Sequence, residues 1–514
     1  MPEQTPPPPV APDWDADDDE DGVDAAPNVT ERVPGSRLRL AGRVSARVGT
    51  GVVLVAAVAL TIAASLLPLP GIHRAAVHTT VTPVPTAQQL VCPGGLVRLA
   101  SASGKGANTA SSLGPAAVTS GATSGAVSQK PFADSDASTG KTQSAPQLLS
   151  TAAAPVGTPT LIAGAQSQSI ATDEFVGMSS AACSAPAGDV WLAGGATSVG
   201  RTTLLLLANP TDVTATVSLQ ISGENGVVTA PGMTGITVAA QSQRVLSLAG
   251  FAPDLVSPVV HVTSQGGQIV AELEQSTVRG LEAGGIDFVG AQAVPVKSVV
   301  IPGVVLSGTA NVQSKLGQTG FDDLQTTLRV YTPGSKSGTV RVTVLAENGK
   351  PVGSASQSDL DPGAVTDLPL DELSDGSYTI LVRATVPLVA SVRVSTAGSV
   401  AVANHTDFAW MTAAPLLTST ALFSVAPAMT TLHLENPTGK DEQVTVHALG
   451  GTDTPVTVAA GVAVAVPVTP QSTYQLTGFR GLYASVTGVA DGGVTGYVVN
   501  PTERGSTPIT IYPH

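Results

Sequence analysis

The sequence reads TLLLLANPTDVTATVSLQISGENG over residues 203–226. An apolar run ends at Asn209-Pro210, a run that alternates apolar and polar residues follows, and Asn225-Gly226 closes the segment. Alternation with a period of two is typical of a strand with one buried face, and Asn-Gly between two such runs is a strong hairpin signal. Because proline cannot donate to a β ladder, we expect Pro210 to end the first strand.

Two later segments repeat this pattern. TTLRVYTP stands at residues 326–333 and TTLHLENP at residues 430–437, and an alternating run and a turn follow each of them. Short strands with turn signals at regular spacing predict an all-β protein of tandem immunoglobulin-like antiparallel β-sandwich domains. A barrel is the open alternative, whereas each copy is too long for a propeller blade.

Two further apolar runs close each copy, and we expect them to pair as a hairpin. Glu272 and Glu274 lie in the first of these hairpins, on one face of a strand because side chains alternate. Two neighbouring carboxylates suit acid–base chemistry or calcium binding, but we expect this face to be the solvated outer one. The expected hairpins join residues 259–263 to 268–273, 378–384 to 388–395, and 482–486 to 494–499.

One long stretch without charge, Val48–Leu69, precedes the repeats. At about 1.5 Å of rise per residue, a helix of this length crosses the hydrocarbon core of a bilayer. Arginines are frequent before the stretch and only Arg74 follows it closely, so the positive-inside rule places the N-terminus in the cytoplasm. We therefore expect a single-pass signal-anchor in the cytoplasmic membrane, with residues 70–514 extracytoplasmic. A cleaved signal peptide is the alternative.

The residues before this stretch combine Pro6–Pro9 with a run of carboxylates from Asp13 to Asp24. Such a segment favours polyproline II, repels itself and has little apolar surface to bury, so we expect a disordered tail. The whole chain has a formal charge of −14 and is acidic on both sides of the predicted span. We therefore do not expect nucleic acid as a partner.

Cys92 and Cys183 are the two cysteines of the sequence, and both follow the predicted span. An isolated pair in an oxidising compartment most often forms a disulfide, which we predict here, with two buried free thiols as the alternative. The stretch between them is rich in Ser, Ala, Gly and Thr, so we expect a flexible low-complexity loop over residues 101–170. The predicted organisation is a tail (1–47), the span (48–69), a linker (70–85) and three sandwich domains (86–297, 298–410 and 411–514).

These features together resemble a family of actinobacterial membrane-anchored envelope proteins of unknown function. The resemblance rests on the acidic leader, the single span, Cys92-Pro93-Gly94, Cys183 followed by Trp191, and the repeated strand-Asn-Pro units. That family carries no established activity and no catalytic residues. The resemblance therefore implies a location in the envelope and transfers no chemistry.

No motif in the sequence carries a recognisable reaction. The histidines are scattered without H-x-x-x-H or H-x-H spacing, and there is no G-x-S-x-G elbow or phosphate-binding loop. Asp322-Asp323 and Asp359–Asp361 fall in expected loops and turns, where aspartate has backbone roles. We expect Trp191 and Trp410 to be core or interdomain residues. We therefore predict no catalytic, metal-binding or cofactor-binding residue.

The sequence leaves three functions open. We expect a non-enzymatic, membrane-anchored scaffold of the cell envelope, whose partner is an envelope protein or a wall polymer. The alternative is a binding module for a wall glycan or lipid, and an envelope hydrolase or transferase is a third. Only 3% of the residues are aromatic, which counts against carbohydrate binding on exposed rings.

Overall fold

The computed structural model describes residues 79–81, 87–99, 110–132, 134–136, 145–153, 160–292, 294–347, 349–352, 356–371, 373–399, 405–502 and 509–511, with Ala56, Val58 and Ala59. The predicted tail and nearly all of the predicted span and linker lie outside these residues. Among the residues described, no helix has the length and apolar character needed to span a bilayer. The chain divides into two units, Met1–Val77 and His78–His514, and the fold described below is that of the second unit.

The second unit is built from antiparallel β-sheets, and its basic unit is a pair of sheets around a shared core. Residues 189–289, copy two, show this pair most completely. Counted in chain order, strands one, six, three and four form one sheet, and strands eight, seven, two and five form the other. These strands are β11 (Asp189–Ala193), β12 (Arg201–Asn209), β13 (Ala215–Gly223), β15 (Ile236–Val238), β16 (Ser242–Ser247), β17 (Val259–Gly266), β18 (Val270–Arg279) and β19 (Glu282–Val289).

The same strand order recurs in copy three, residues 296–412. There β25 serves as both the sixth and the seventh strand, because it pairs with β20 and β22 in one sheet and with β21 and β26 in the other. The strands are β20 (Val296–Leu306), β21 (Thr327–Tyr331), β22 (Gly338–Ala346), β23 (Ser356–Leu360), β24 (Val365–Pro369), β25 (Gly376–Ala397) and β26 (Thr406–Thr412).

Copy four, residues 421–498, repeats the order with eight separate strands. Its two sheets enclose one core of leucine, valine and alanine side chains, to which Phe423 and Tyr474 contribute a stacked ring pair. The strands are β27 (Ala421–Val425), β28 (Thr431–Glu435), β29 (Glu442–Ala448), β30 (Asp453–Val458), β31 (Ala463–Pro467), β32 (Ser472–Thr477), β33 (Tyr483–Ala490) and β34 (Gly493–Val498).

A further copy, which the sequence patterns did not reveal, precedes these three in residues 89–182. This copy one has the first, second, third, sixth, seventh and eighth strands in the same pairing. They are β2 (Gln89–Cys92), β5 (Ala117–Ala122), β6 (Ser128–Pro131), β8 (Gln147–Ser150), β9 (Ile162–Ala171) and β10 (Val176–Ala182). The prediction of a flexible loop over residues 101–170 is therefore wrong for the described part of that range. Main-chain hydrogen bonds hold these strands, and they need no apolar alternation.

Shorter elements complete the described chain. β3 (Val97–Leu99) pairs with β4 (Ala110–Ser112), β14 (Gly226–Val227) pairs with the end of β13, and β7 (Asp134–Ser135) pairs in parallel with β16. β1 (Thr79–Val81) pairs with β35 (Ile509–Ile511). The helical elements are η2 (Leu248–Gly250), α2 (Thr309–Leu316) and η3 (Asp322–Leu324).

Two predictions about strand pairing are wrong. β17 and β18 do not pair with each other, because the chain crosses between the two sheets after Gly266, which has a positive φ of 82°. Residues 378–384 and 388–395 belong to the single strand β25, which continues through Pro387. Only the third expected hairpin, β33 with β34, is confirmed. The prediction of an all-β fold of antiparallel sheets is confirmed; within each copy the first strand pairs with the sixth, whereas in an immunoglobulin domain it pairs with the second.

The Asn-Pro motif has a role that the sequence analysis missed. The buried Asn436 Nδ2 donates to the carbonyl oxygens of Lys440 and Val458, both at 2.8 Å, and its Oδ1 accepts hydrogen bonds from the N–H and hydroxyl of Thr438. Asn209 makes the equivalent bonds to Val213, Val238 and Thr211 in copy two. The asparagine therefore links the second strand by hydrogen bonds to two later segments of its own copy. This role is additional to that of the proline, which ends the ladder.

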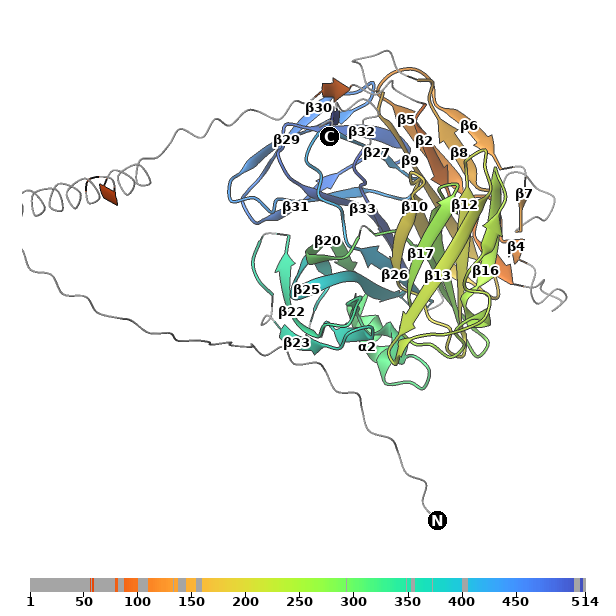
Figure 1. Ribbon diagram of the computed structural model, residues 1–514. Helices are drawn as coiled ribbons and strands as arrows, with labels where there is room; N and C mark the ends of the chain where they lie inside the picture. Colours follow the sequence, from red (N-terminus) through yellow and green to blue (C-terminus); the bar gives the residue numbers. More distant parts are fainter. Residues whose placement is uncertain are drawn as a thin grey trace, which may run out of the picture. The chain divides into compact units, whose positions relative to one another are not determined.

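The four copies close around one axis, and their colours follow the bar from orange to blue in Figure 1. Their last strands, β10, β19, β26 and β34, pack against one another in that cyclic order, and β34 also packs against β10. Contact between copies explains the four consecutive leucines of β12. Leu205 and Leu207 face the core of copy two, whereas Leu204 and Leu206 pack with Leu96 and Phe175 of copy one. Both faces of this strand are therefore buried.

Candidate functional site

Four buried polar residues meet where the last strands cross the axis, one from each copy. Thr495 donates to Asp287 Oδ1 at 3.2 Å, and the Trp410 N–H donates to Asp287 Oδ2 at 3.1 Å. Asp407 Oδ2 accepts hydrogen bonds from the N–H groups of Met178 (2.9 Å) and Val494 (3.2 Å). The four residues are Ser179, Asp287, Asp407 and Thr495, and each is at most 1% exposed.

Burial dominates the electrostatics of this axial cluster. It raises the pKa of Asp407 to about 8, and it raises the pKa of Asp287 well above its usual range, with the nearby Asp407 carboxyl adding to the effect. Glycine makes room for the carboxyl, because a Cβ at Gly177 or Gly285 would overlap Asp407 Oδ1. This cluster fixes the register in which four strands from four copies meet.

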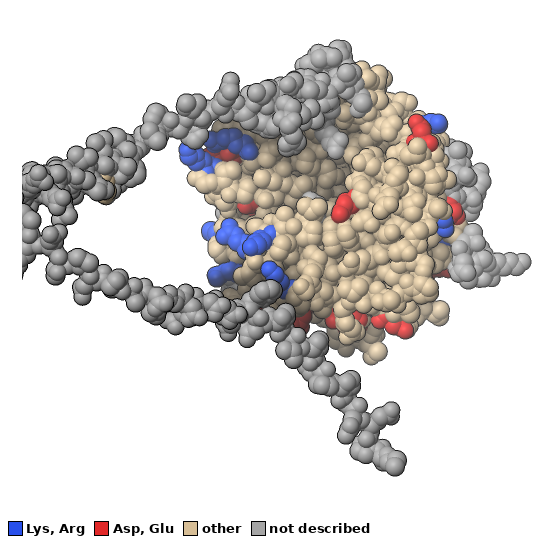
Figure 2. Space-filling model, viewed as in Figure 1, with Lys and Arg blue, Asp and Glu red and all other residues tan. Residues whose placement is uncertain are grey.

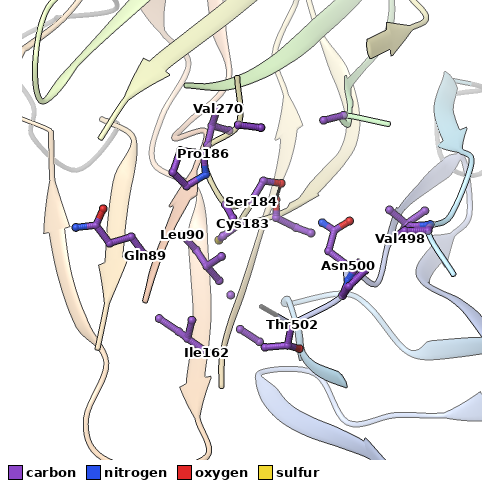
Figure 3. Close-up of a pocket in the computed structure, with 18 of the residues that line it drawn as sticks. Gln89, Leu90, Ile162, Cys183, Ser184, Pro186, Val270, Val498, Asn500 and Thr502 are labelled. Carbon is purple, nitrogen blue, oxygen red and sulfur yellow. Dashed lines mark hydrogen bonds between the residues drawn. The ribbon is translucent and has the colours of Figure 1, made fainter. Parts of the chain in front are cut away.

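A cavity of about 660 Å³ opens where the last strands leave the axis. Its wall includes residues after β10, β19 and β34, together with the beginnings of β2, β18 and β27, so copies one, two and four supply most of it. Figure 3 shows Leu90, Cys183 and Ser184 together with Asn500 and Thr502 among the side chains that line it. The volume lies within the range of small-molecule sites. We call this cavity the axial pocket.

The wall of the axial pocket carries almost no charge. Asp189 is the one charged residue among the described residues that line it, and its Oδ1 lies 3.1 Å from Nε2 of His261. Amide side chains supply most of the remaining polar groups, beside small apolar residues. The amides belong to Gln88, Gln89, Gln268, Gln292 and Asn500.

The disulfide forms part of this wall. Cys92 and Cys183 are bonded, and they join the first strand of copy one to the residue after its last strand. Val91 and Ser184 exchange main-chain hydrogen bonds of 2.8 and 2.9 Å beside it. The bond therefore holds the segment 182–187, which lines the pocket, against β2.

A second cavity of about 20 Å³ adjoins the axial pocket, since the two share the wall residues Ala182, Ser184, Ala291, Tyr497, Val498 and Asn500. It has room for about one water-sized group. Glu272 lines it, is 2% exposed, and its Oε2 has no hydrogen-bond partner among the described residues. Burial raises the pKa of this carboxyl to about 8.

The expectation that Glu272 and Glu274 face solvent is wrong. β18 lies between the core of copy two and copy one, so both of its faces are covered. Both oxygens of Glu274 accept from the N–H of Val97 in β3, at 3.1 and 3.2 Å. Burial raises the pKa of Glu274 well above its usual range, and that hydrogen bond opposes the shift.

A second unpartnered polar atom lies in the wall of the axial pocket. Gln292 is 8% exposed, and its Oε1 accepts from the N–H of Ala390 at 3.3 Å. Its Nε2 has no hydrogen-bond partner among the described residues. The site therefore offers one buried acceptor in Glu272 and one buried donor in Gln292.

The other residues singled out by sequence have structural roles. Trp191 stacks on His261 with ring centroids 3.9 Å apart, and Trp410 Nε1 donates to Gln275 at 2.7 Å, so both tryptophans are buried where copies two and three meet. Asp323 is more than a loop residue. Its carboxylate lies 2.8 to 3.1 Å from guanidinium nitrogens of Arg201, Arg279 and Arg393, whose charges lower its pKa against the effect of burial.

Sequence reasoning missed the site because no local pattern marks it. Glu272 and Gln292 come from strands whose alternation gives no sign of a neighbouring copy. The one available signal was the segment VAEL at residues 270–273. Three of its four residues are apolar, which is typical of a strand buried on both faces, and only Glu272 interrupts the pattern.

Two-sheet copies arranged around an axis, with a cavity at one end of that axis, define an all-β protein of antiparallel sheets. The chain belongs to the family of unknown function DUF5719, whose model matches residues 137–477. No curated protein matches the chain. A solved structure, "Crystal Structure of Thermotoga maritima 1070", is similar over 23% of this chain and 93% of its own, with 20% sequence identity and a TM-score of 0.19.

Proposed function

We propose that this protein is a non-enzymatic binding protein of the cell envelope, whose axial pocket takes a small ligand. The observation that carries the proposal is a pair of unpartnered buried atoms, Gln292 Nε2 in the wall of the axial pocket and Glu272 Oε2 in the wall of the adjoining small cavity. A buried polar group without a partner costs about 1–3 kcal/mol. A ligand that supplies a donor to one and an acceptor to the other recovers that cost on binding. The pocket thus favours a ligand-binding module over a purely structural scaffold.

The proposed location rests on the sequence. The apolar stretch Val48–Leu69 would anchor the chain in the cytoplasmic membrane with its N-terminus inside, and residues 70–514 would be extracytoplasmic. The disulfide supports this placement, because such bonds persist in oxidising compartments.

A thermal-unfolding assay on the full-length protein in detergent tests the proposal. We expect a soluble extract of envelope small molecules and oligosaccharides to raise the Tm saturably, because a ligand that binds only the folded state stabilises it. Asn500→Trp, which fills the pocket from its wall, should abolish the shift. Gln443→Trp, on an exposed position of β29, is the matched control and should preserve it. An equal shift in both variants would refute the axial pocket as the site.

A second function, a scaffold for an envelope protein, is supported by a separate surface. Arg341 and Arg383 lie directly opposite each other on β22 and β25, both are exposed, and neither has an ion-pair partner among the described residues. Like charges in this position are destabilising. Lys and Arg gather at the left edge of the face seen in Figure 2, which otherwise carries few charges. An acidic partner would relieve the repulsion. Crosslinking in intact cells, compared between the wild type and Arg341→Ser/Arg383→Ser, tests this scaffold.

A further inference from the structure

We infer that the ligand of the axial pocket is the uncharged sugar end of a glycan, bound by one hydroxyl at Glu272 and another polar oxygen at Gln292. This inference rests on the proposed function and specifies its ligand. It follows from the charge, the depth and the walls of the pocket.

The scarcity of charged residues in the wall of the pocket counts against anionic and cationic ligands. No Lys or Arg is among the described residues that line the pocket, so an anionic phosphate, carboxylate or lipid headgroup would lose its hydration without gaining a cation. The Asp189 carboxylate already has His261 beside it. Burial keeps Glu272 protonated at neutral pH, since its pKa is raised to about 8, so a cationic ligand would first have to displace that proton. A neutral ligand meets neither cost.

The size of the inner cavity limits which group of a ligand can reach Glu272. The inner cavity of about 20 Å³ holds a group of the size of a water molecule. A sugar hydroxyl has that size, and because a hydroxyl both donates and accepts, it can pair with Glu272 Oε2 whichever carboxyl oxygen carries the proton. Gln292 Nε2, in the wider part, is then free to donate to a second hydroxyl or to the ring oxygen. A sugar residue that extends from the wider part into the inner cavity would satisfy both unpartnered atoms.

The walls suit the less polar surfaces of a sugar ring. Phe423 and Tyr497 line the pocket, and the Tyr497 hydroxyl is already bonded to the Ser424 carbonyl oxygen at 2.8 Å and to the Ala426 N–H at 3.1 Å. Its ring therefore serves as an apolar wall. An enclosed site of this kind removes the need for exposed aromatic platforms, whose scarcity in the sequence counted against glycan binding.

Binding of charge-fractionated wall oligosaccharides to the full-length protein tests the inference. The probes are oligosaccharides released from the cell wall by mild acid and separated into neutral, acidic and basic fractions, each titrated calorimetrically. We expect saturable binding of the neutral fraction and at least tenfold weaker binding of the others. Stronger binding of the acidic or basic fraction would overturn the sugar assignment and leave the proposed function standing. Absence of binding in every fraction would overturn the sugar assignment, and an unshifted Tm with whole extract would overturn the proposed function as well.

Matched variants separate recognition from folding. Glu272→Leu and Gln292→Leu should each weaken binding of the neutral fraction about tenfold, because each removes one hydrogen bond to the ligand. Glu272→Leu should leave the Tm of the free protein unchanged or higher, since the carboxyl it removes is buried and unpartnered. Glu435→Leu is the control, because Glu435 Oε2 is also buried and unpartnered but lies outside the pocket. Unchanged binding by Glu272→Leu, or an equal loss in Glu435→Leu, would overturn the inference.

Discussion

Copy one and copy four share a strand order and hold it by different means. Copy four has all eight strands and a large core, in which Leu432, Leu434 and Leu476 are fully buried. Copy one has six of these strands among the described residues, built largely of Ser, Ala, Gly and Gln, and its own core is a small cluster around the bonded Cys92 and Cys183. Its remaining apolar contacts are with copies two and four.

The difference shows that two copies with the same strand order can be stabilised in two ways. Copy four is stabilised mainly by burial of its own side chains, which scales with apolar area. Copy one depends on a covalent link and on packing against its two neighbouring copies. Where the core is small, constraint of the unfolded chain replaces burial. The pocket lies beside the copy that is held in this second way.

Removal of the disulfide is the strongest test of this comparison. Cys92→Ala/Cys183→Ala should lower the free energy of unfolding by about 4 kcal/mol, because the bond closes a loop of 91 residues. Denaturant unfolding measures the loss, and hydrogen exchange shows where it falls. We expect faster exchange in copy one and little change in copy four. Equal loosening of both copies would contradict separate stabilisation.

Truncation of the copy-four core comes next. Leu434→Ala should cost about 3 kcal/mol, since it leaves a cavity among fully buried neighbours. The matched change in copy one, Leu149→Ala, should cost less, because a small cluster surrounds Leu149. Chemical denaturation of both variants checks the order. A larger loss for Leu149→Ala would reverse the comparison.

Loss of the hydrogen bonds made by Asn436 should have a smaller effect on the free energy of unfolding. Asn436→Ala should cost about 2 kcal/mol, since several buried main-chain groups lose their partner together. The equivalent position in copy three is Thr332, whose Oγ1 is buried without a hydrogen-bond partner among the described residues. Thr332→Ala should therefore change stability by only a few tenths of a kcal/mol. If both substitutions cost the same in urea unfolding, the hydrogen bonds of Asn436 are not what holds the copy.

The pH dependence of stability gives the finest test, at the contact between copies one and two. Because burial raises the pKa of Glu272 from 4.5 to about 8, its proton stays bound in the folded state at pH values where the unfolded chain has released it. The stability that depends on this protonation is complete below pH 4.5 and is lost as the pH rises through about 8.

Glu272→Gln should remove this dependence. Relative to the wild type, the variant should gain about 2–3 kcal/mol of stability between pH 5 and pH 7. Urea unfolding at several pH values measures the difference, and hydrogen exchange should show copy one loosening first in the wild type at alkaline pH. A constant difference between the two proteins at all pH values would show that the carboxyl does not titrate in this range.

Much of the fold was readable from the sequence, and the reasons for the failures are physical. Alternation and Asn-Gly turns found the strands of copies two to four, and β13 with β14 forms the expected hairpin around Glu224-Asn225. Periodicity cannot tell whether a run turns back, crosses to the other sheet or continues, so β17, β18 and β25 were paired wrongly. Copy one escaped notice because small side chains such as Gly164 and Ala165 form strands without an apolar signature.

The candidate site was not predictable in the same way. Glu272 reads as a surface residue in its own strand, because only the presence of a neighbouring copy covers it. The axial cluster of Asp287 and Asp407 depends on four segments of the chain that come together only when all copies have folded. The local sequence pattern indicates that a strand forms. Which of its faces is buried depends on how the four copies pack against one another.

The ends of the described chain lie close together. Ala87 and Thr502 both line the axial pocket, and the segments beyond them, β1 and β35, are paired with each other. A short peptide joining these segments, with new termini opened in the turn at Gly450-Gly451, would give a circular permutant with every strand pairing intact. In such a permutant the chain would start in copy four and pass the axial pocket without a break, and the strand order of all four copies would be kept.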